Sequence, residues 1–290
     1  MKKKITVLIC LVLAAVSVFT LTSCLGKGDN DNSTTTTDPT GTTEAPVVKD
    51  LEAITANKKL VIGITDFEPM DYQDADGKWI GFDADLAEKV CEKLGVTAEF
   101  KLIVWDKNIV ELNGKTIDCI WNGFTIDEDR AKNVTFSKEY MINRQSIVIH
   151  KDNSANFKDI ATLDKASFTA ENGSAGEKAI KANDTLKDNK YVGVNGQIDA
   201  LKEVLAKTSD AAVLDYTMAA YLINKEGSDF ANLMVLDDEI SAKEYYGIGF
   251  RKGSDLADKV NEILAELEAD GTIKAIAEKY GLEDSLVKIK

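Results

Sequence analysis

The sequence predicts an α/β fold in which parallel sheets are covered by helices. From about residue 51 onward, short runs rich in β-branched residues alternate with amphipathic segments of helical period. This alternation is typical of parallel strands that are joined by helices. The folded part contains roughly 240 residues, which is enough for two α/β domains of ordinary size.

The first half of the folded part contains one helix with clear end signals. Residues 82–94 are predicted to be helical, because their apolar side chains share one face and Gly95 stands where a helix would end. Those apolar residues are Leu86, Val90, Cys91 and Leu94. The other expected elements are a turn at 74–77, strands at 60–64, 99–104, 117–121 and 145–150, and a short helix at 108–112.

The second half repeats the same alternation. The expected strands are 167–170, 191–194, 211–214, 233–236 and 245–250. The expected helices are 176–182, 198–206, 216–224, 256–268 and 272–280. Gly247-Ile-Gly249 begins like a dinucleotide-binding loop, but the next glycine, Gly253, falls outside that motif's spacing. We therefore expect no nucleotide site there.

The first 24 residues predict export and attachment to a membrane by lipid. Lys2-Lys3-Lys4 is a charged start, and 5–19 is an apolar run of signal-peptide length. Leu21-Thr-Ser-Cys24 resembles the lipobox of bacterial lipoproteins, which makes 1–23 the signal peptide and Cys24 the residue that carries lipid such as palmitate. An uncleaved membrane anchor is the alternative, although the apolar run is short for a span.

Residues 24–50 are predicted to form a flexible tether between the lipid and the folded part. They are rich in Thr, Asp, Asn, Gly and Pro and have too little apolar surface to fold. These features place the protein outside the cytoplasm, anchored to the bacterial cell membrane by its N-terminus.

Charge and residue usage argue against several functions. The net charge of −14 becomes −17 once residues 1–23 are removed, because they contain three lysines and no acidic residue. Such a charge argues against nucleic acid or anionic lipid as a partner. His150 is the single histidine, so zinc sites and Ser-His or Cys-His pairs are hard to build. We expect no metal, no cofactor and no catalytic residue. Cys91 and Cys119 stand in apolar stretches, which favours two buried thiols over a disulfide.

One segment combines a strand end, a tight turn and a helix start around an arginine. After the turn at Asn122-Gly123, Thr125 and the acids 127–129 suit the positive start of a helix, whereas Arg130 opposes the helix dipole. A guanidinium in this position can bind a carboxylate bidentately, with backbone N–H groups and the Thr125 hydroxyl alongside. The alternative is an exposed arginine paired with one of the neighbouring acids.

Four motifs occur in a definite order along the chain. They are Gly81–Val90, Trp121–Arg130 with Phe136-Ser137 after it, Asp210–Asp215, and Tyr246–Gly253. In order and spacing they resemble the polar amino-acid-binding proteins of ABC importers, which are family 3 of the bacterial extracellular solute-binding proteins. The resemblance covers about residues 60–281.

The resemblance implies a two-lobed, periplasmic-binding-protein-like α/β fold, with parallel-rich sheets flanked by helices and joined by two hinge strands. It assigns 51–148 and 246–290 to lobe 1 and 149–245 to lobe 2. The hinges are expected near 149–150 and 245–246. The ligand is expected in the cleft between the lobes, where closure buries it.

The resemblance also implies which residues bind the charged groups of an amino acid. Arg130 matches the arginine that binds the α-carboxylate, with the Thr125 hydroxyl beside it. Gly173-Ser174-Ala175 matches a turn whose N–H groups reach the same carboxylate. Gly123 is expected to direct a carbonyl to the α-ammonium, and Asp215 to pair with it. Opposite charges are required because a buried zwitterion without partners is costly.

Phe67 and Trp105 match the two positions whose side chains enclose the ligand side chain, and core packing is their alternative. Asp66 and Glu68 flank Phe67 and could meet a cationic or amide group, although loop acids are more often solvated. Asn122-Gly123 stands where small hydroxyl residues are frequent in the family, which leaves the ligand open. We expect a long polar or cationic side chain (glutamine, arginine, lysine, histidine or cystine) over aspartate and glutamate.

The resulting hypothesis is a non-enzymatic, monomeric lipoprotein that captures a free L-amino acid and delivers it to an ABC permease in the membrane. One alternative is a prephenate- or arogenate-type dehydratase on the same fold, in which Glu171 or Glu177 would serve as acid or base. Another is a surface domain that uses the cleft to sense a ligand.

Overall fold

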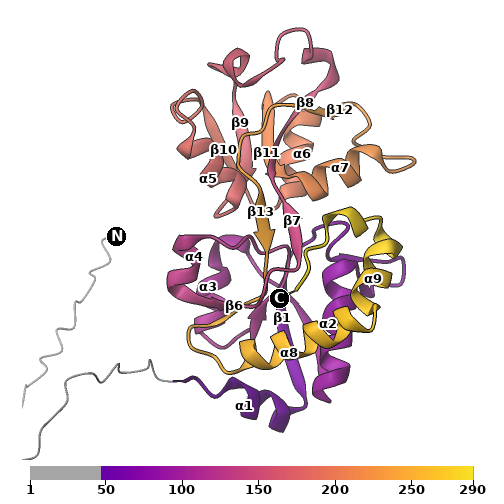
Figure 1. The fold of residues 1–290 in the computed structure, drawn as a ribbon. Coiled ribbons are helices and arrows are strands. Elements are labelled where there is room, and N and C mark those ends of the chain that lie inside the picture. The colour runs from indigo at the N-terminus through magenta and orange to yellow at the C-terminus, as the bar shows by residue number, and fades with distance from the viewer. Residues whose placement is uncertain (1–46, 290) are drawn as a thin grey trace, which may run out of the picture. The chain divides into compact units, whose positions relative to one another are not determined.

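The computed structural model describes residues 47–289. The predictions for the signal peptide, for the lipid on Cys24 and for the tether up to residue 46 lie outside these residues. Among the helices within 47–289, none is long and apolar enough to cross a membrane. The described residues form a two-lobed α/β fold, with one five-stranded sheet in each lobe (Figure 1).

The first lobe is built on a sheet with the strand order β4-β1-β5-β14-β6. Its strands are β1 (Lys59–Ile64), β4 (Thr97–Leu102), β5 (Cys119–Ile120), β6 (Val134–Phe136) and β14 (Gly249–Arg251). β1 pairs in parallel with β4 and β5, whereas β14 lies antiparallel between β5 and β6. A strand from late in the chain therefore completes a sheet that the early part begins.

Helices of the first lobe pack against this sheet and against one another. They are α1 (Asp50–Asn57), α2 (Phe82–Leu94), α3 (Asn108–Asn113), α4 (Glu128–Asn133), α8 (Leu256–Ala269) and α9 (Thr272–Tyr280), with the short 3₁₀ turns η1 (Trp105–Lys107) and η4 (Glu283–Ser285) and the hairpin β2 (Tyr72–Gln73) and β3 (Trp79–Ile80). α2 contacts β4, α8 and α9. The helix predicted over 82–94 is confirmed, and it ends at Gly95 in the left-handed conformation (φ +69°).

The second lobe is built on a sheet with the strand order β10-β9-β11-β8-β12. Its elements are β8 (Gln145–His150), η2 (Lys151–Asn153), η3 (Ile160–Leu163), β9 (Phe168–Glu171), α5 (Ala175–Ala182), β10 (Tyr191–Val194), α6 (Gln197–Leu205), β11 (Ala211–Asp215), α7 (Tyr216–Asn224) and β12 (Leu233–Val235). α5 and α6 contact β9 and β11, and α7 contacts β8, β11 and β12. The carboxyl ends of β9 and β11 thus lie beside the starts of α5 and α6.

Two short strands connect the lobes. β7 (Met141–Asn143) and β13 (Glu244–Tyr246) pair antiparallel and lie between the two sheets (Figure 1). The expected hinge at 149–150 is wrong, because both residues lie within β8, where they pair with β11 and β12. The expected lobe boundary at 148 likewise cuts through β8, all of which belongs to the second sheet.

The strand expected at 245–250 is divided into β13 and β14. The two halves have different partners, since β13 pairs with β7 and β14 pairs with β5 and β6. Gly247 lies at the division, where a Cβ atom would come within 2.8 Å of Ile126 Cδ1. A larger residue there would require the Ile126 side chain to move.

The sheets are mixed and not parallel throughout, which corrects the expected parallel-rich sheets. In each sheet, two neighbouring strand pairs are parallel and two are antiparallel. The antiparallel pairs involve β8 and β14. These strands follow β7 and β13 along the chain, so they enter their sheets from the crossing and without a crossover helix.

The expected tether ends earlier than residue 50. Val48 forms a β-bridge with Ser254, and Asp50 is buried at the start of α1. The Asp50 carboxylate accepts hydrogen bonds from Arg251 Nε at 2.9 Å and from Ser254 Oγ at 2.7 Å. Residues 48–50 therefore belong to the folded first lobe, because a buried guanidinium requires this carboxylate as a partner.

Candidate functional site

A small cavity lies between the lobes. The first lobe contributes Trp105, Asn122, Gly123, Thr125 and Arg130 to its lining, and the second lobe contributes Glu171, Ser174, Ala175, Gln197 and Asp215. The structure therefore brings together the predicted site residues except Phe67 and Asp66, and it adds Glu171 and Gln197.

Arg130 is held in the cavity by the start of α4. Asp127 caps this helix, since its carboxylate accepts hydrogen bonds from the backbone N–H groups of Asp129 and Arg130. The Arg130 side chain is 11% exposed, and its Nε lies 3.5 Å from Asp127 Oδ2. The alternative of an exposed arginine is therefore wrong, although its pairing with a neighbouring acid is present.

The guanidinium of Arg130 also contacts both lobes. Nη1 donates to the Thr125 carbonyl at 2.8 Å, and Nη2 donates to the Gly173 carbonyl at 3.3 Å. The guanidinium carbon lies 4.6 Å from the centre of the Phe124 ring, so an aromatic face supports the cation. Burial lowers the pKa of Arg130 and nearby carboxylates oppose this effect, but an arginine remains charged in either case.

Asp215 lies at the end of β11 with both carboxylate oxygens occupied by donors. Oδ1 accepts from Tyr246 Oη at 2.8 Å, from Gln145 Nε2 at 3.2 Å and from Asn143 Nδ2. Oδ2 accepts from Gln197 Nε2 at 2.6 Å. Burial raises the pKa of Asp215, and these hydrogen bonds and the charge of Arg130 lower it in part.

Glu171 at the end of β9 is a site residue that the sequence suggested only for the dehydratase alternative. It is 2% exposed and lines the cavity, and its Oε1 has no hydrogen-bond partner among residues 47–289. Burial raises the pKa of Glu171 well above its usual value, the charge of Asp215 raises it further, and Arg130 lowers it. A buried carboxyl with an open oxygen is thus available to a ligand.

A third carboxyl, on Glu244 of β13, lies next to the cavity. Its Oε2 accepts from Gln145 Nε2 at 3.0 Å and from Thr125 Oγ1 at 3.4 Å. It lines a neighbouring hollow that shares Thr125 and Ala175 with the cavity. Burial raises the pKa of Glu244, and the charge of Asp215 adds to this effect. No sequence pattern pointed to Glu244, because a single acid in a hinge strand has no local signature.

The turn at Asn122-Gly123 presents its main chain to the cavity. The Asn122 amide oxygen accepts from Thr65 N at 3.1 Å and from Thr65 Oγ1 at 2.6 Å, and its Nδ2 donates to Asp71 Oδ2 at 2.7 Å. The polar atoms of the Asn122 side chain are therefore engaged within the first lobe. Gly123 has φ +52°, and a Cβ atom there would lie 2.4 Å from the Phe67 ring.

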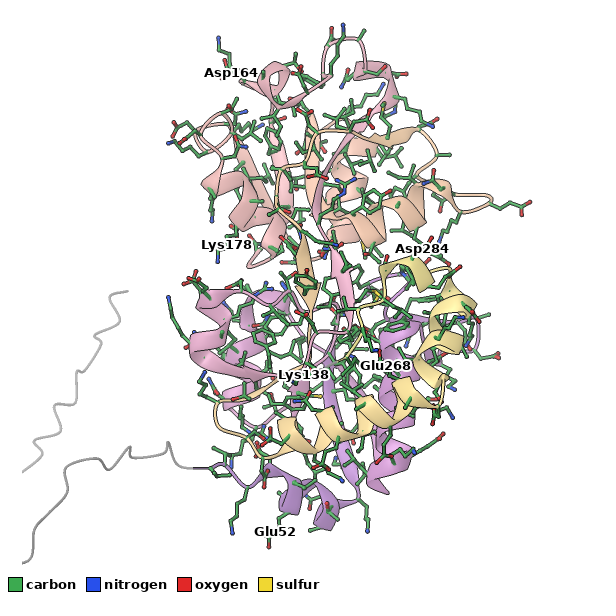
Figure 2. The ribbon with its side chains drawn as sticks, in the orientation of Figure 1. Glu52, Lys138, Asp164, Lys178, Glu268 and Asp284 are labelled. Carbon is green, nitrogen blue, oxygen red and sulfur yellow. The ribbon has the colours of Figure 1, made fainter. Side chains whose placement is uncertain are left out.

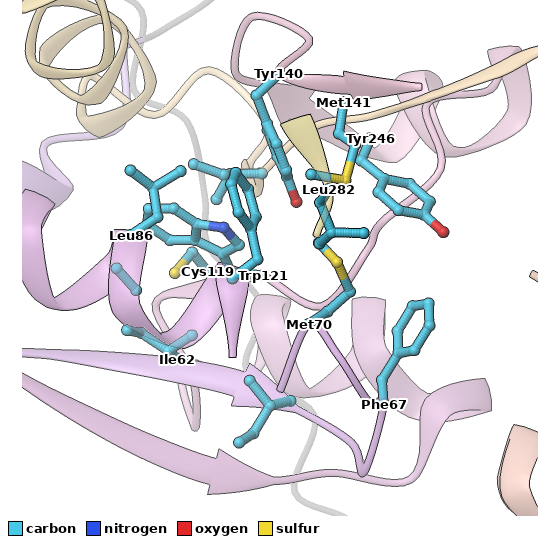
Figure 3. Close-up of a cluster of buried hydrophobic side chains, with 14 of the residues drawn as sticks. Ile62, Phe67, Met70, Leu86, Cys119, Trp121, Tyr140, Met141, Tyr246 and Leu282 are labelled. Atoms are coloured by element: carbon cyan, nitrogen blue, oxygen red, sulfur yellow. The ribbon is translucent and has the colours of Figure 1, made fainter. Parts of the chain in front are cut away.

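The two predicted aromatic walls have different positions. Trp105 lines the cavity, and its ring packs edge-on against Phe124 with the centroids 5.6 Å apart. Phe67 does not line the cavity; it is buried in the hydrophobic cluster that Figure 3 shows, where its ring packs edge-on against Tyr246. The core-packing alternative therefore describes Phe67 in this structure.

The loop acids near Phe67 also lie away from the cavity. Asp66 is exposed and is absent from the lining, which corrects its predicted place in the site. Burial of part of its carboxyl and the charge of Glu68 raise the pKa of Asp66. Glu68 forms an ion pair with Lys225 of the second lobe at 2.7 Å. Its role here is a contact between lobes.

Ser174 and Ala175 form the start of α5 at the cavity. The Ser174 side chain accepts from the Glu177 N–H at 3.1 Å and so caps the helix. The first N–H groups of a helix lack partners within the helix, which suits them to a carboxylate. The Ser174 hydroxyl is thus occupied by the Glu177 N–H, so this helix start can bind a ligand carboxylate only through backbone N–H groups.

Metal chemistry has no support within residues 47–289, where no cluster of three or more His, Cys, Asp or Glu side chains could hold an ion. Cys91 and Cys119 are free and buried, as predicted. Burial raises the pKa of Cys91 to about 12, so this thiol stays protonated.

The fold and the cavity together define a two-lobed α/β protein with its candidate site between the lobes. The chain belongs to the bacterial extracellular solute-binding proteins, family 3, whose sequence profile matches residues 60–283. The L-cystine-binding protein TcyJ of Escherichia coli (strain K12) is 28% identical over 223 residues, which are 76% of this chain and 82% of TcyJ.

Two solved structures are similar over most of the chain. An ABC uptake transporter substrate binding protein from Streptococcus pneumoniae with bound histidine is 30% identical, with a TM-score of 0.76 over 83% of this chain and 99% of that one. AncCDT-1 is described as an ancestral amino acid-binding protein and a precursor of cyclohexadienyl dehydratase. It is 32% identical, with a TM-score of 0.73 over 80% of this chain and 99% of its own. These proteins are described as binding proteins and not as enzymes.

Proposed function

We propose that this protein captures a free L-amino acid between its lobes and delivers it to an ABC permease. The observation that carries the proposal is the presence of Arg130 and Asp215, from opposite lobes, in one cavity. The α-carboxylate of an amino acid would pair with the guanidinium, and the α-ammonium would pair with the aspartate. Because the two partners belong to different lobes, a bound ligand would hold the lobes together.

Other lining groups complete the proposed binding of the two charges. The Thr125 hydroxyl and the N–H groups at Ser174-Ala175 would join Arg130 around the carboxylate. The main chain at Gly123 would join Asp215 around the ammonium. Trp105 would supply a flat wall for the ligand side chain. Each of these residues lines the same cavity, which supports their acting on one ligand.

The charges around the cavity favour a ligand with an additional cation or several hydrogen-bond donors. Arg130 is the one cation in the lining of residues 47–289, whereas Glu171 and Asp215 line it as acids and Glu244 lies beside it. A zwitterion adds no net charge, so a basic side chain would reduce the excess of carboxyls. We therefore propose a long polar or cationic amino acid (glutamine, arginine, lysine, histidine or cystine) over aspartate and glutamate.

The proposal includes the anchor predicted from the first 24 residues. We propose that Cys24 carries the lipid, that the protein acts outside the cytoplasm as a monomer, and that the permease is its membrane partner. The name of the Streptococcus pneumoniae protein, an ABC uptake transporter substrate binding protein, supports the assignment of such a partner.

A dehydratase is the second candidate, because one observation favours it. The pKa of Glu171 is raised by burial, and a carboxyl with a raised pKa inside a cavity that can bind a carboxylate suits a general acid. AncCDT-1, a precursor of a cyclohexadienyl dehydratase, is similar in fold and is itself described as a binding protein. Non-enzymatic binding remains the proposal over a prephenate dehydratase, because the Arg130 and Asp215 pair suits a zwitterion and prephenate has no ammonium group. Arogenate has one, so incubation with arogenate decides that case.

Calorimetry against a panel of L-amino acids and their methyl esters tests the proposed function. We expect binding of one or more free amino acids and loss of binding for the esters, because the ester removes the charge that Arg130 pairs with. Removal of one partner of a buried pair costs about 3–5 kcal/mol, so Arg130→Ala should weaken binding by several hundredfold or more. Arg144→Ala is the matched control, because Arg144 lies outside the cavity, stacked on Tyr216.

Equal affinity for an amino acid and its ester would contradict the assignment of Arg130. Incubation with prephenate and arogenate, followed by detection of phenylpyruvate or phenylalanine, decides the second candidate. Product formed by the wild-type protein and lost in Glu171→Gln would replace the receptor proposal with the enzyme.

A further inference from the structure

Two buried aspartates lie beneath the binding turn at Asn122-Gly123 and have no part in the proposed function so far. Asp71 and Asp83 are 0% and 1% exposed. The Oδ1 atom of each has no hydrogen-bond partner among residues 47–289. Asp83 belongs to the motif Gly81–Val90, which helps to identify the family, but no residue of this motif lines the cavity.

The hydrogen bonds of these carboxyls converge on the turn. Asp83 Oδ2 accepts from the Gly123 backbone N–H at 2.7 Å and from Tyr140 Oη at 3.0 Å. Asp71 Oδ2 accepts from the Asn122 side-chain amide at 2.7 Å. One aspartate therefore holds the main chain of the turn, and the other holds its side chain.

The glycine of the motif makes this arrangement possible. Gly81 has φ +125°, and a Cβ atom there would lie 2.1 Å from the Met70 carbonyl oxygen. The start of α2 can therefore approach Met70, whose carbonyl accepts the backbone N–H of Asp83 at 2.9 Å. This contact places Asp83 beside Asp71 and below the turn.

Among residues 47–289, no strand pairing extends to the turn, so side chains hold it. β5 ends at Ile120, and Gly123 lies beyond it in the left-handed conformation. The N–H and C=O of a trans peptide point in opposite directions. When Asp83 binds the Gly123 N–H, the Asn122 carbonyl of the same peptide faces away from the carboxylate. Asn122 and Gly123 both line the cavity, so the direction of this peptide decides which atoms meet a ligand.

The pair lies in an apolar environment, and the two carboxyls repel each other when both are charged. Burial raises the pKa of Asp83 to about 7 and raises that of Asp71 well above its usual value, with the charge of Asp83 as a further cause. The titratable groups that face them are Tyr140, whose hydroxyl contacts Asp83, and Cys119, whose pKa Asp71 helps to raise. The pair therefore retains a proton in acid and changes its charge state near neutrality.

We propose that Asp83, with Asp71 beside it, is a positioning residue for the ligand. Its carboxylate fixes the peptide before Gly123, which sets the direction of the Asn122 carbonyl and positions Gly123, whose carbonyl is expected to meet the ligand's ammonium. This inference rests on the proposed function for its effect on affinity. The support of the turn itself can be measured without any ligand.

Asp83→Asn tests the affinity effect with little change in size. We expect binding of the preferred amino acid from L-arginine, L-histidine and L-cystine to weaken by about tenfold to a hundredfold, the usual effect of a lost charged hydrogen bond. Asp85→Asn is the matched control on the same helix, because Asp85 binds Lys279 and Tyr280 and does not contact the turn. Its affinity should stay within about threefold of wild type. Equal losses in both variants would overturn the proposal.

Nuclear magnetic resonance of the Gly123 amide tests the support of the turn in the ligand-free protein. In wild type and in Asp85→Asn, this resonance should titrate near the pKa of Asp83, about 7. In Asp83→Asn the titration should disappear, whereas an unchanged titration would overturn the inference. Should Asp83→Asn not fold, Tyr140→Phe removes one donor to the same carboxylate and must shift the midpoint, and no shift would also overturn it.

These two measurements separate the inference from the proposed function. A wild-type protein that binds none of the three amino acids, but whose Gly123 amide titrates as expected, would refute the ligand class and retain the support of the turn. Binding that is insensitive to Asp83→Asn would refute the positioning role and retain the receptor.

Discussion

At the end of β9, the Glu171 carboxyl keeps one oxygen without a donor among the described residues, although a cavity surrounds it. An unpaired buried polar atom is costly, and such atoms in proteins often have a functional reason. Burial raises the pKa of Glu171 well above its usual value, and the neighbouring charge of Asp215 raises it further. A cationic ligand group would reverse this effect, because an adjacent positive charge lowers the pKa of a carboxyl.

We therefore expect Glu171→Gln to change which amino acid the protein prefers. Affinity for L-arginine should fall by about tenfold or more, because the glutamine cannot ionise, while affinity for L-glutamine should change by less than about threefold. Wild type should release a proton when it binds L-arginine near neutral pH. Calorimetry in two buffers of different protonation enthalpy detects this release, and it should be absent in Glu171→Gln.

The control for this prediction is Glu203→Gln on α6, which is outside the cavity and bonds to Thr208. It should keep both the affinity and the proton release of wild type. Parallel losses for L-arginine and L-glutamine in Glu171→Gln would mean that Glu171 supports the cavity without selecting the ligand.

Of the predicted site residues, Arg130 has a contrast in its own segment, because it opposes the dipole of the helix it begins. Asp215 was expected only from the resemblance to the family. Gln197 lines the cavity and Glu244 lies beside it, but each is a common polar residue without such a contrast. Their roles depend on the crossing of the chain between the lobes, which local sequence does not specify.

At the scale of elements, the start of α5 and the start of α4 contact each other across the cleft. Lys178 of α5, which Figure 2 labels on the second lobe, forms ion pairs with Asp129 at 2.9 Å and with Asp127 at 3.4 Å on the first lobe. Glu68 and Lys225 form a second pair between the lobes. These side chains are partly or largely exposed, so salt should screen the pairs and each should contribute little.

Lys178→Met should weaken ligand binding by less than about threefold at low salt and should have no effect at high salt. The dissociation rate should rise by the same factor, because these ion pairs join the two lobes. Stopped-flow measurements at two salt concentrations check this expectation. Lys187→Met is the control, since Lys187 pairs with Asp184 within the second lobe.

A loss comparable to that of Arg130→Ala would show that surface pairs, and not the ligand's own charges, hold the lobes together. We expect Arg130→Ala to weaken ligand binding more than Lys178→Met does, because Arg130 is the more buried residue. Arg130 acts inside a cavity, where charges interact strongly, whereas Lys178 acts in contact with water.

The predicted boundaries of helices and strands were correct where local sequence determines them and wrong where a distant partner does. The helices at 82–94 and 216–224 and the strands at 145–150 and 191–194 were predicted with the bounds that the structure has. The helix at 82–94, for example, has its apolar residues on one face and a glycine at its end. The strand expected at 245–250 was not predicted correctly, because its division depends on β7 pairing with one half only.

At the scale of the whole molecule, the first 46 residues and the folded part are expected to act separately. Cys24→Ala should release the processed protein from the membrane fraction, because the lipid is its expected anchor. Ligand affinity should remain within about twofold of wild type, since the residues that line the cavity begin at Trp105. Fractionation and calorimetry measure the two effects.

Cys10→Ala is the matched control, because Cys10 lies in the predicted apolar run and precedes the lipobox. It should leave the protein on the membrane. Processed Cys24→Ala protein that still sediments with membranes would contradict the lipid assignment. Weakened binding by a chain that starts at residue 47 would contradict the separation.

The position of β14 between β5 and β6 has a consequence for the order in which a growing chain can assemble. The strands of the second sheet, β8 to β12, form one uninterrupted stretch, so that sheet has all its members once residue 235 has been made. The first sheet lacks an interior strand until residues 249–251 emerge. Arg251, which binds both Asp50 and Asp118, arrives with that strand. The lobe that is synthesised first is thus the one completed last. Until Arg251 can bind Asp50 and Asp118, an incomplete chain remains accessible to chaperones and to proteases.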